Sequence, residues 1–563
     1  MDKEQKRLPV GLENFEQMIQ DNYYYVDKTG LISELLRNGG MVNLFTRPRR
    51  FGKTLNMSML EYFFSIEGDK SIFEGLEITK DIKLCKEYMG KYPVIFVSLK
   101  GINASSYDTA FRLTVETIKS VAGRAKFLER SDKLDEHEKE DYRALLDKDM
   151  DEATLCFSLK TLSELLEKHY KTKVIVLIDE YDVPLAKAFE NGYYTQMVFL
   201  IRNMLEQVLK TNDSLKFAVM TGCMRISKES IFTGLNNLKV LSAADERYDE
   251  YFGFTDTEVK ELLKYYEIED HYEEIKNWYD GYRFGNVEVY CPWDLLNHCD
   301  KIKDYAEAIP ENYWINTSNN EAVRKFIQMS DKLTTKREIE RLLGGEEIIK
   351  EIHQELTYPE MYQSLENIWS LLFMTGYLTQ HGRVDARRYK LAIPNLEIRD
   401  IFKIQIMECF KENVAKDGDT LNQFCEALKN GEEKQVETLL EGYLKKTISI
   451  RDTFVRKSMK ENFFHGILLG ILGIKEEWGV FSNQETGEGY SDILIETENS
   501  ETVILIEVKY ANDGNLEQAC ERALGQIDEK KYDGEFKESG VNKILKYGIA
   551  CYRKHCKVKL ADW

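Results

Sequence analysis

The chain has 563 residues, of which 43% are hydrophobic and 31% are charged, and its formal net charge is −20. This length exceeds what one hydrophobic core supports, so we expect about two to four domains in an ordinary globular protein rather than a disordered or fibrous one. The acidic balance argues against a protein that coats nucleic acid or an anionic membrane with its whole surface, although it leaves room for a local basic groove.

The compartment is predicted from the start of the chain, its apolar runs and its cysteines. The opening MDKEQKRLPVGLENF lacks the apolar core of a signal peptide, and the longest apolar run, FFHGILLGILGI, is too short to span a bilayer and predicts a buried helix. The 10 cysteines are scattered, and the close pair Cys551 and Cys556, with His555, fits buried thiols better than a zinc site. We therefore expect a cytoplasmic protein without a membrane segment.

A strand, a basic loop and a helix are predicted in succession over residues 41–66. The loop, TRPRRFGKTL, ends in Gly52-Lys53-Thr54, the tail of a phosphate-binding loop. In such a loop, backbone N–H groups at a helix N-terminus face the anion, the lysine reaches the terminal phosphates, and the hydroxyl binds Mg²⁺. Arg47 stands where the full pattern has a glycine, so a solvated basic loop without a nucleotide is the alternative for this motif alone. Arg47, Arg49, Arg50 and Lys53 together predict a basic spot.

Three further apolar runs of strand length follow the loop, at 93–99, 173–178 and 216–220. Because these runs are apolar on both faces, they predict strands that are covered on both sides. Helical patterns separate them, which predicts a parallel, three-layer α/β domain over about residues 1–250.

Polar side chains end two of these strands. Asp179 can hold Mg²⁺, together with the Thr54 hydroxyl, and the adjacent Glu180 can orient or deprotonate the attacking water, unless the two acids only cap a turn. Thr221 ends the next strand and is placed to sense the terminal phosphate. Arg225 follows it, and either stabilises charge on the transferring phosphoryl group or forms a surface ion pair. Together with the loop, these residues predict a site for ATP and Mg²⁺.

The rest of the chain divides into a helical part and a second α/β part. Residues 255–380 have mainly helical periodicity, residues 377–395 predict a β-hairpin around His381-Gly382, and a helical stretch runs from about 397 to 472. After it, SDILIE, TVILIEVKY and KILKYGIACY predict strands, and LEQACERALGQIDEKKY predicts a helix.

A second group of charged residues lies on two of the C-terminal strands. Asp492 opens one strand, and Glu507 and Lys509 lie two apart on the next, so their side chains face the same way. Paired strands can bring Asp492 beside Glu507, where two carboxylates bind a divalent cation and hold a water for in-line attack on phosphorus. The lysine can orient that water and neutralise charge. A surface charge pair is the weaker alternative, because VILIEVKY is buried in character and buried charges need partners.

The segments YYYVDKTGLI, RPRRFGKT, LIDEYDVPL, TGCMRISKESIFTGLNNL, WYDGYRFG and YCPWDLL resemble the bacterial AAA-ATPase-like family of P-loop proteins. In that family an arginine in place of the first glycine is usual. The resemblance implies a P-loop ATPase domain over residues 1–250, followed by a helical lid and winged-helix-like region over 251–400. Asp27 and Lys28 either lie near the nucleotide or have a capping role. The residues that we expect to bind the nucleotide are Arg49, Arg50, Phe51, Gly52, Lys53, Thr54 and Thr221.

About the last hundred residues resemble the PD-(D/E)xK nuclease superfamily, in the variant often fused to such ATPases, and we expect a domain of this kind over residues 401–563. The resemblance implies a restriction-endonuclease-like α/β domain that cleaves phosphodiesters with Mg²⁺, with Asp492, Glu507 and Lys509 at its centre. Glu461, in the preceding helix, and Gln526, in the following helix, match supporting residues of that superfamily, or are ordinary exposed residues at helix ends.

The leading hypothesis is therefore an ATP-dependent nuclease, in which ATP hydrolysis gates a Mg²⁺-dependent site that cuts nucleic acid, with DNA favoured. The alternative is a nucleotide-gated switch, in which ATP sets a conformation or a homo-oligomeric state and the C-terminal fold recognises a partner or nucleic acid without cutting it. A scaffold in which neither site works is disfavoured, because the chemical residues of both sites are present together.

Overall fold

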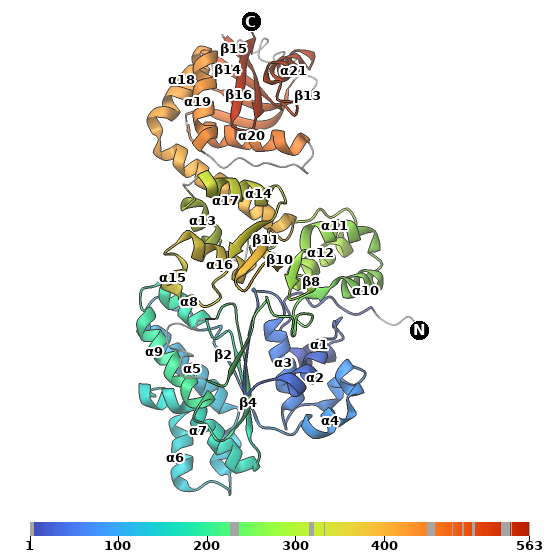
Figure 1. Cartoon of the computed structure of the whole chain (residues 1–563), viewed down its shortest axis with the longest axis vertical. Helices are drawn as coiled ribbons and strands as arrows, with labels where there is room; N and C mark the ends of the chain where they lie inside the picture. The colour runs from blue at the N-terminus through green and yellow to red at the C-terminus, as the bar shows by residue number, and fades with distance from the viewer. Residues whose placement is uncertain are drawn as a thin grey trace. The chain divides into compact units, whose positions relative to one another are not determined.

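The structure is a computed structural model (Figure 1). It describes residues 5–225, 236–314, 320–330, 333–446, 457–475, 477–486, 489–497, 502–530, 541 and 543–561. The chain divides into two compact units, of which the first comprises residues 1–318 and 349–398 and the second comprises 319–348 and 399–563. The three-domain division with boundaries at 250 and 400 stays a prediction. The fold is mixed α/β, with a parallel sheet in the N-terminal part and a mixed sheet in the C-terminal part.

A five-stranded parallel sheet forms the centre of the first unit, in the order β2-β3-β4-β1-β5. Its strands are β1 (Val42–Thr46), β2 (Val94–Ser98), β3 (Val174–Asp179), β4 (Leu215–Gly222) and β5 (Leu238–Leu241). Every residue of β1 and β3 is buried, as continuous apolar runs predict for strands covered on both faces. The parallel three-layer prediction is confirmed, whereas β5 was not among the predicted strands.

Helices cover both faces of this sheet, with α2 and α3 beside one face and α5, α7 and α9 beside the other (Figure 1). The helices up to this point are α1 (Phe15–Gln20), α2 (Gly30–Asn38), α3 (Lys53–Phe64), α4 (Ile82–Tyr88), α5 (Tyr107–Gly123), α6 (Glu136–Ala144), α7 (Glu152–Tyr170), α8 (Val183–Glu190) and α9 (Tyr194–Leu209). Because all five strands are parallel, the ends of β1, β3 and β4 lie along one edge, where Thr46 pairs with Gly222. The phosphate loop and both strand-end motifs start from this edge.

The rest of the first unit is mainly helical and carries two small three-stranded sheets, ordered β6-β8-β7 and β10-β11-β9, in which the β6–β8, β7–β8 and β10–β11 pairs are antiparallel. The helices are α10 (Asp256–Tyr266), α11 (Tyr272–Tyr279), α12 (Pro292–Asp304), α15 (Tyr358–Met361) and α16 (Leu365–Thr375). The strands are β6 (Phe254–Thr255), β7 (Tyr282–Phe284), β8 (Val287–Tyr290), β9 (Ile348–Glu351), β10 (Thr379–Arg383) and β11 (Arg388–Ala392).

The predicted hairpin at 377–395 forms, but its turn does not lie at His381-Gly382. Gly382 has a φ of 122° and lies within β10, where the register shifts between Gln380 and Arg383. The chain reverses at 384–387 instead, where the Asp385 carboxylate accepts hydrogen bonds from the N–H groups of Arg387 and Arg388. A glycine inside a strand marked an irregularity here, while an aspartate formed the turn.

The second unit contains a mixed five-stranded sheet in the order β12-β13-β14-β15-β16, in which β14 and β15 are parallel and the other neighbours antiparallel. Its strands are β12 (Gly479–Thr486), β13 (Gly489–Glu496), β14 (Thr502–Tyr510), β15 (Lys543–Tyr552) and β16 (His555–Ala561). Its helices are α13 (Glu321–Gln328), α14 (Leu333–Leu343), α17 (Leu396–Lys416), α18 (Gly418–Asn430), α19 (Glu433–Lys446), α20 (Lys457–Leu472) and α21 (Leu516–Glu529).

The apolar run at 463–474 is a buried helix, as predicted. Phe464, Ile467, Leu468 and Ile471 of α20 pack into the core of the second unit, together with side chains of α18, α19 and the sheet. Across the described ranges, none of the helices has the length and apolar character needed to cross a membrane.

Candidate nucleotide and metal sites

The phosphate loop leads from β1 into α3 through two left-handed residues. Arg50 has a φ of 71° and Gly52 a φ of 77°, and Gly52 is the N-cap of α3. Glycine occupies such a conformation without strain, whereas for arginine it is uncommon. The loop therefore ends at the N-terminus of a long helix, where free backbone N–H groups favour an anion.

The two residues expected to hold Mg²⁺ at this loop are in direct contact. The Thr54 hydroxyl Oγ1 donates to Asp179 Oδ2 at 2.9 Å, and the Thr221 hydroxyl donates to Asp179 Oδ1. Asp179 is fully buried at the end of β3, so its carboxylate is held between two hydroxyl groups from β4 and α3. A carboxylate and a hydroxyl at one point are oxygen donors of the kind that Mg²⁺ takes alongside phosphate oxygens and water. The donor set therefore fits the ion.

Lys53 and Glu180 are the sequence neighbours of Thr54 and Asp179. The Lys53 ammonium donates to the carbonyls of Arg47 at 3.1 Å and Pro48 at 2.8 Å, within its own loop. Glu180 has a φ of 51°, and its N–H donates to the Thr221 hydroxyl at 3.2 Å. Burial raises the pKa of Glu180, and Lys53 opposes this shift. A carboxylate with a raised pKa, beside the expected phosphate position, is suited to take a proton from water.

A cavity of about 510 Å³ opens beside the loop, within the range of small-molecule sites. The loop residues 49–54 line it, as does Glu180, and its apolar walls come from residues 9–12 and 24–26 and from Pro292, Trp293 and Leu296. Thr221 is not among the lining residues, because it lies 1% exposed behind Asp179. The cavity brings the predicted loop residues to one surface with an apolar compartment beside them.

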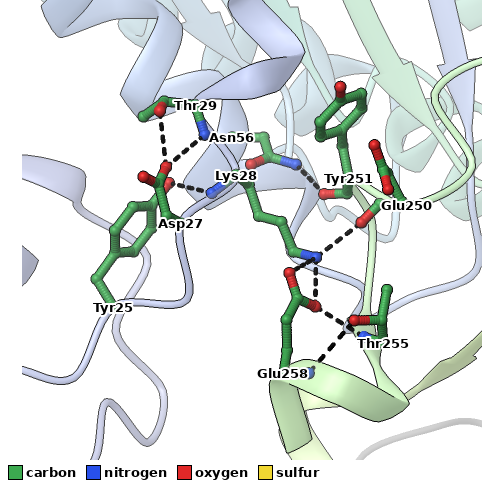
Figure 2. A network of polar contacts seen from close by, with 9 residues as sticks. All are labelled: Tyr25, Asp27, Lys28, Thr29, Asn56, Glu250, Tyr251, Thr255 and Glu258. Atoms are coloured by element: carbon green, nitrogen blue, oxygen red, sulfur yellow. Dashed lines mark hydrogen bonds and ion pairs between the residues drawn. The ribbon is translucent and has the colours of Figure 1, made fainter. Parts of the chain in front are cut away.

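Lys28 lines this cavity, and Figure 2 shows the polar contacts that hold the segment around Asp27 and Lys28. The Asp27 carboxylate accepts hydrogen bonds from Thr29 N at 2.9 Å and Thr29 Oγ1 at 2.7 Å, just before α2 begins. The Lys28 ammonium donates to both carboxylate oxygens of Glu258 and to the Glu250 carbonyl, each at 2.7 Å (Figure 2). Asp27 therefore holds Thr29, the N-cap residue of α2, without itself capping the helix, and Lys28 ties this segment to the start of α10.

Arg47 does not belong to a basic spot, contrary to the sequence interpretation. Its side chain is fully buried, with the guanidinium carbon 4.9 Å from the ring centre of Phe252 and 5.3 Å from that of Phe284. Its nitrogens donate to the carbonyls of Thr46, Leu241 and Tyr248. The arginine in place of the first loop glycine thus fastens the loop to residues 241–252, and burial lowers its pKa to about 10.

Three other predicted residues differ in what they offer to a nucleotide. The Phe51 ring is fully buried against Tyr282 and Phe284, which leaves its backbone as the part that can contact a ligand. Arg49 is exposed at the cavity. Its pKa is raised, first by Cys223 and then by the Asp182 carboxylate. Arg225 forms an ion pair with Glu355 at 2.6 Å, which is the alternative stated for it.

Sequence reasoning missed Asp182, which fixes the segment after β4. Its Oδ2 accepts hydrogen bonds from Cys223 N at 2.9 Å and Met224 N at 3.1 Å, while Tyr181 donates its hydroxyl to the Met224 carbonyl at 2.6 Å. Asp182 directly precedes α8, and Pro184 lies near the start of that helix, so the sequence pattern predicts an ordinary N-cap role for Asp182. The side chain makes no cap bond and holds the neighbouring loop instead.

The second cluster lies on β13 and β14 of the second unit. Asp492 precedes the cross-strand pair of Ile493 with Ile506, and Glu507 follows it, so the two acids lie at one level of the sheet. Asp492 Oδ2 accepts from Val508 N at 2.9 Å, and Glu507 Oε1 pairs with Lys509 Nζ at 2.8 Å. Glu507 is fully buried, and within the described residues its Oε2 has no hydrogen-bond partner.

The electrostatics of this cluster favour a cation. Burial, and then the Asp492 carboxylate, raise the pKa of Glu507 to about 7. Burial lowers the pKa of Lys509, but the hydrogen bond and the charge of Glu507 raise it by more, so the pKa is raised overall. A buried carboxylate oxygen without a donor, beside a second carboxylate, fits a divalent ion. No set of three or more His, Cys, Asp or Glu residues close enough to hold a metal occurs in the described parts, so such an ion would take its other ligands from water and phosphate.

Two residues of α20 contact this cluster. Glu461 Oε1 accepts from Tyr510 N at 3.3 Å, and His465 Nε2 lies 2.7 Å from the Asp492 carbonyl and 3.3 Å from Ser482 Oγ. His465 was missed, because a single histidine in an apolar helix carries no signal of its own.

Gln526 lies half-buried on α21, and its supporting role stays a prediction. Cys551 and Cys556 are paired across β15 and β16 as buried thiols.

Comparison with known proteins agrees with both halves of this description. Residues 9–232 match the family model described as predicted AAA-ATPase, and residues 459–561 match that of the PD-(D/E)XK nuclease superfamily. A protein of Azotobacter chroococcum mcd 1, described as an uncharacterized protein in the vnfD 5' region, is 28% identical over 411 residues, which are 70% of this chain and 68% of that protein. The chain therefore carries an AAA-ATPase-like domain and a PD-(D/E)XK nuclease superfamily domain, as both resemblances implied.

Proposed function

We propose that this chain binds and hydrolyses ATP at the loop site, and that the nucleotide cycle gates Mg²⁺-dependent cleavage of nucleic acid at the second site. The two domain families themselves suggest an ATPase and a nuclease. The observation that carries the proposal is the contact between Thr54 and Asp179, which joins residues 125 positions apart at the start of the loop helix. DNA as the substrate, homo-oligomerisation and a cytosolic location are parts of the proposal.

At the first site, the residues have distinct tasks. Thr54 and Asp179 would hold Mg²⁺, which when bound neutralises charge on the phosphate oxygens. The Lys53 ammonium exchanges the carbonyls of Arg47 and Pro48 for phosphate oxygens, which are the stronger acceptors. Glu180 takes the proton of the attacking water, and its backbone is fixed for this by the hydrogen bond to Thr221.

At the second site, Asp492 and Glu507 would hold the metal ion, whose contribution when bound is to stabilise charge on the phosphodiester. Lys509 orients the water and neutralises charge that develops on phosphorus oxygens. His465 holds the backbone of Asp492 and so keeps its carboxylate beside Glu507.

The nucleotide-gated switch stays the second candidate because of one contact. Lys509 already pairs with Glu507 at 2.8 Å. Such a pair is suited equally to a nuclease and to a surface that binds phosphate without cleaving it.

Four proteins test the proposal: wild type, Lys53→Ala, Asp179→Asn and Asp492→Asn. We expect Mg²⁺-dependent ATP hydrolysis by wild type and Asp492→Asn only, and Mg²⁺-dependent cleavage of DNA or RNA that Asp492→Asn lacks. Hydrolysis without cleavage of any strand type in wild type would favour the switch. The absence of both reactions in wild type with Mg²⁺ present contradicts the proposal.

A further inference from the structure

We propose that Arg50 of the phosphate loop transmits nucleotide occupancy to the second unit, through a buried cluster formed by Asp294, Trp314 and Glu397. The inference rests on the proposed nucleotide site and adds a means by which that site regulates the rest of the chain. All four residues belong to the first unit.

Arg50 connects the phosphate loop to this cluster. Its guanidinium carbon lies 4.9 Å from the ring centre of Trp314, and Nη2 donates to the Trp314 carbonyl at 3.4 Å. Nη1 lies 3.9 Å from Asp294 Oδ1, which is longer than a hydrogen bond. Arg50 also lines the cavity beside the loop and has a left-handed backbone, so its position depends on the conformation of the loop.

The cluster itself is buried and closely linked. Trp314 is 1% exposed and donates its backbone N–H to Glu397 Oε1 at 2.8 Å, and both Asp294 and Glu397 are fully buried. Burial raises the pKa of Asp294 to about 6, and burial together with Asp294 raises the pKa of Glu397 well above its usual range. Burial thus disfavours the charged form of both acids, and the Arg50 guanidinium offsets the negative charge that they carry.

Both points at which the chain leaves the first unit lie within a few residues, in sequence, of a member of this cluster. The first exit follows residue 318, four positions after Trp314, and the second follows Ile398, the residue after Glu397. Asn395 fixes the second exit, because its Oδ1 accepts from Ile398 N at 3.0 Å and its Nδ2 donates to the Asp280 carbonyl at 3.0 Å. A displacement of Trp314 or Glu397 is thus passed on along the covalent chain to residues of the second unit.

The chemistry of the loop supplies the force for such a displacement. A triphosphate at the loop offers oxyanions, which bind a guanidinium more strongly than the Trp314 carbonyl and the distant Asp294 carboxylate do. If Arg50 turns toward the phosphates, the Trp314 carbonyl loses a donor and the acid pair loses its cation. Because packed interiors rearrange between discrete states, this exchange of partners biases one arrangement of the cluster over another.

The test is hydrogen–deuterium exchange of the full-length chain with Mg²⁺, with and without β,γ-imido-ATP, read on peptides from 320–330 and 399–416. Glu397→Gln is the main variant, since it keeps the size of the side chain and an oxygen that can accept from Trp314 N, and replaces the carboxyl group. Asp294→Asn is the second, because it changes the acid that faces Arg50 and leaves the Trp314 N–H bond in place. Glu366→Gln, an exposed acid on α16, is the matched control.

We expect the analogue to change exchange in both peptides of wild type and of Glu366→Gln. In Glu397→Gln and Asp294→Asn, the change should fall roughly threefold or more, while calorimetry shows that the analogue still binds. An unaltered change in either variant that binds the analogue overturns the inference, as does wild type that binds it without any change. Wild type that fails to bind it contradicts the proposed nucleotide site instead.

Discussion

Glu180 and Glu507 are two acids whose surroundings make them unusual at the scale of single residues. Glu180 has a left-handed backbone at the end of a buried strand, a conformation that costs about 1–3 kcal/mol in a residue other than glycine. Glu507 is fully buried with one carboxylate oxygen lacking a donor among the described residues. Such costs persist where the rest of the fold enforces them, and both acids lie at proposed reaction centres.

Replacing Glu180 separates binding of ATP from its hydrolysis. Glu180→Gln keeps the size of the side chain but cannot accept the proton of water, so we expect the rate of hydrolysis to fall about 100-fold or more with the dissociation constant of ATP little changed. Single-turnover hydrolysis and calorimetry measure the two quantities. Glu190→Gln, on the exposed end of α8, serves as the control. Equal hydrolysis by Glu180→Gln and wild type would exclude this residue as the base.

The raised pKa of Glu507 predicts a pH dependence of stability. The folded chain keeps a proton on Glu507 up to a pKa of about 7, whereas the unfolded chain releases it near the ordinary glutamate pKa of 4.5. The folded state therefore binds more protons between these values, and the free energy of unfolding falls as the pH rises from about 4.5 to about 7.

Urea denaturation without Mg²⁺ across this pH range measures the effect. Glu507→Gln should lose the fall and be more stable than wild type above pH 7, while Glu529→Gln on the exposed end of α21 should behave as wild type does. Added Mg²⁺ should restore stability to wild type at high pH and leave Glu507→Gln unchanged. The same pH profile in wild type and Glu507→Gln would contradict the assignment.

At the scale of elements, the phosphate loop is held by what surrounds it. Arg47 joins the end of β1 to the last residue of β5 and to Tyr248 beyond it. Its guanidinium donates to three carbonyls and packs against two aromatic rings. This arrangement orients the whole loop relative to the segment that precedes α10. The arginine that replaces the first glycine of the loop motif therefore has a structural role.

Removing this arginine should cost the first unit much of its stability. Arg47→Ala leaves three buried carbonyls without their donor, so we expect a loss of about 3 kcal/mol in the free energy of unfolding. Arg37→Ala removes an exposed ion pair with Asp81 and should cost less than about 1 kcal/mol. Urea denaturation of both variants compares the two costs. A similar small cost for Arg47→Ala would mean that its hydrogen bonds are dispensable.

The elements that sequence predicted well are those with a continuous pattern. β1 and β3 are uninterrupted apolar runs, and the helix at 463–474 has no competing interpretation. β5 is only four residues long and half-buried for most of its length, so it lacks such a pattern. The hairpin turn was misplaced, because Gly382 marked a bulge while Asp385 formed the turn.

Most of the residues that form the candidate sites could be predicted from the sequence, but the contacts that position them could not. Strand ends along a parallel edge suggested that Thr54, Asp179 and Thr221 meet, because carboxyl ends of parallel strands lie together. The sequence Arg47-Pro48-Arg49-Arg50 does not indicate that Arg47 is buried and Arg49 exposed. The burial of Arg47 depends on the carbonyls of Leu241 and Tyr248, about 200 positions away in the chain. His465 and Asp182 act through backbone groups, which no side-chain pattern records.

At the scale of the whole molecule, the account joins an ATPase-like unit and a nuclease-like unit in one chain. The first has a carboxylate and a hydroxyl suited to Mg²⁺, and the second has a pair of carboxylates. The chain crosses between the units three times. The proposed link through Arg50 requires that nucleotide at one site alters the reaction at the other. Coupling of this kind between sites is typically worth about 1–3 kcal/mol.

The most direct measurement is the rate of cleavage by the full-length chain across single- and double-stranded DNA and RNA, in Mg²⁺ with and without ATP. The account predicts that wild type cuts at least one of these substrates, that ATP changes this rate by roughly tenfold, and that Lys53→Ala cuts without responding to ATP. Cleavage by wild type at one rate with and without ATP, or by Asp492→Asn as fast as by wild type, would contradict it.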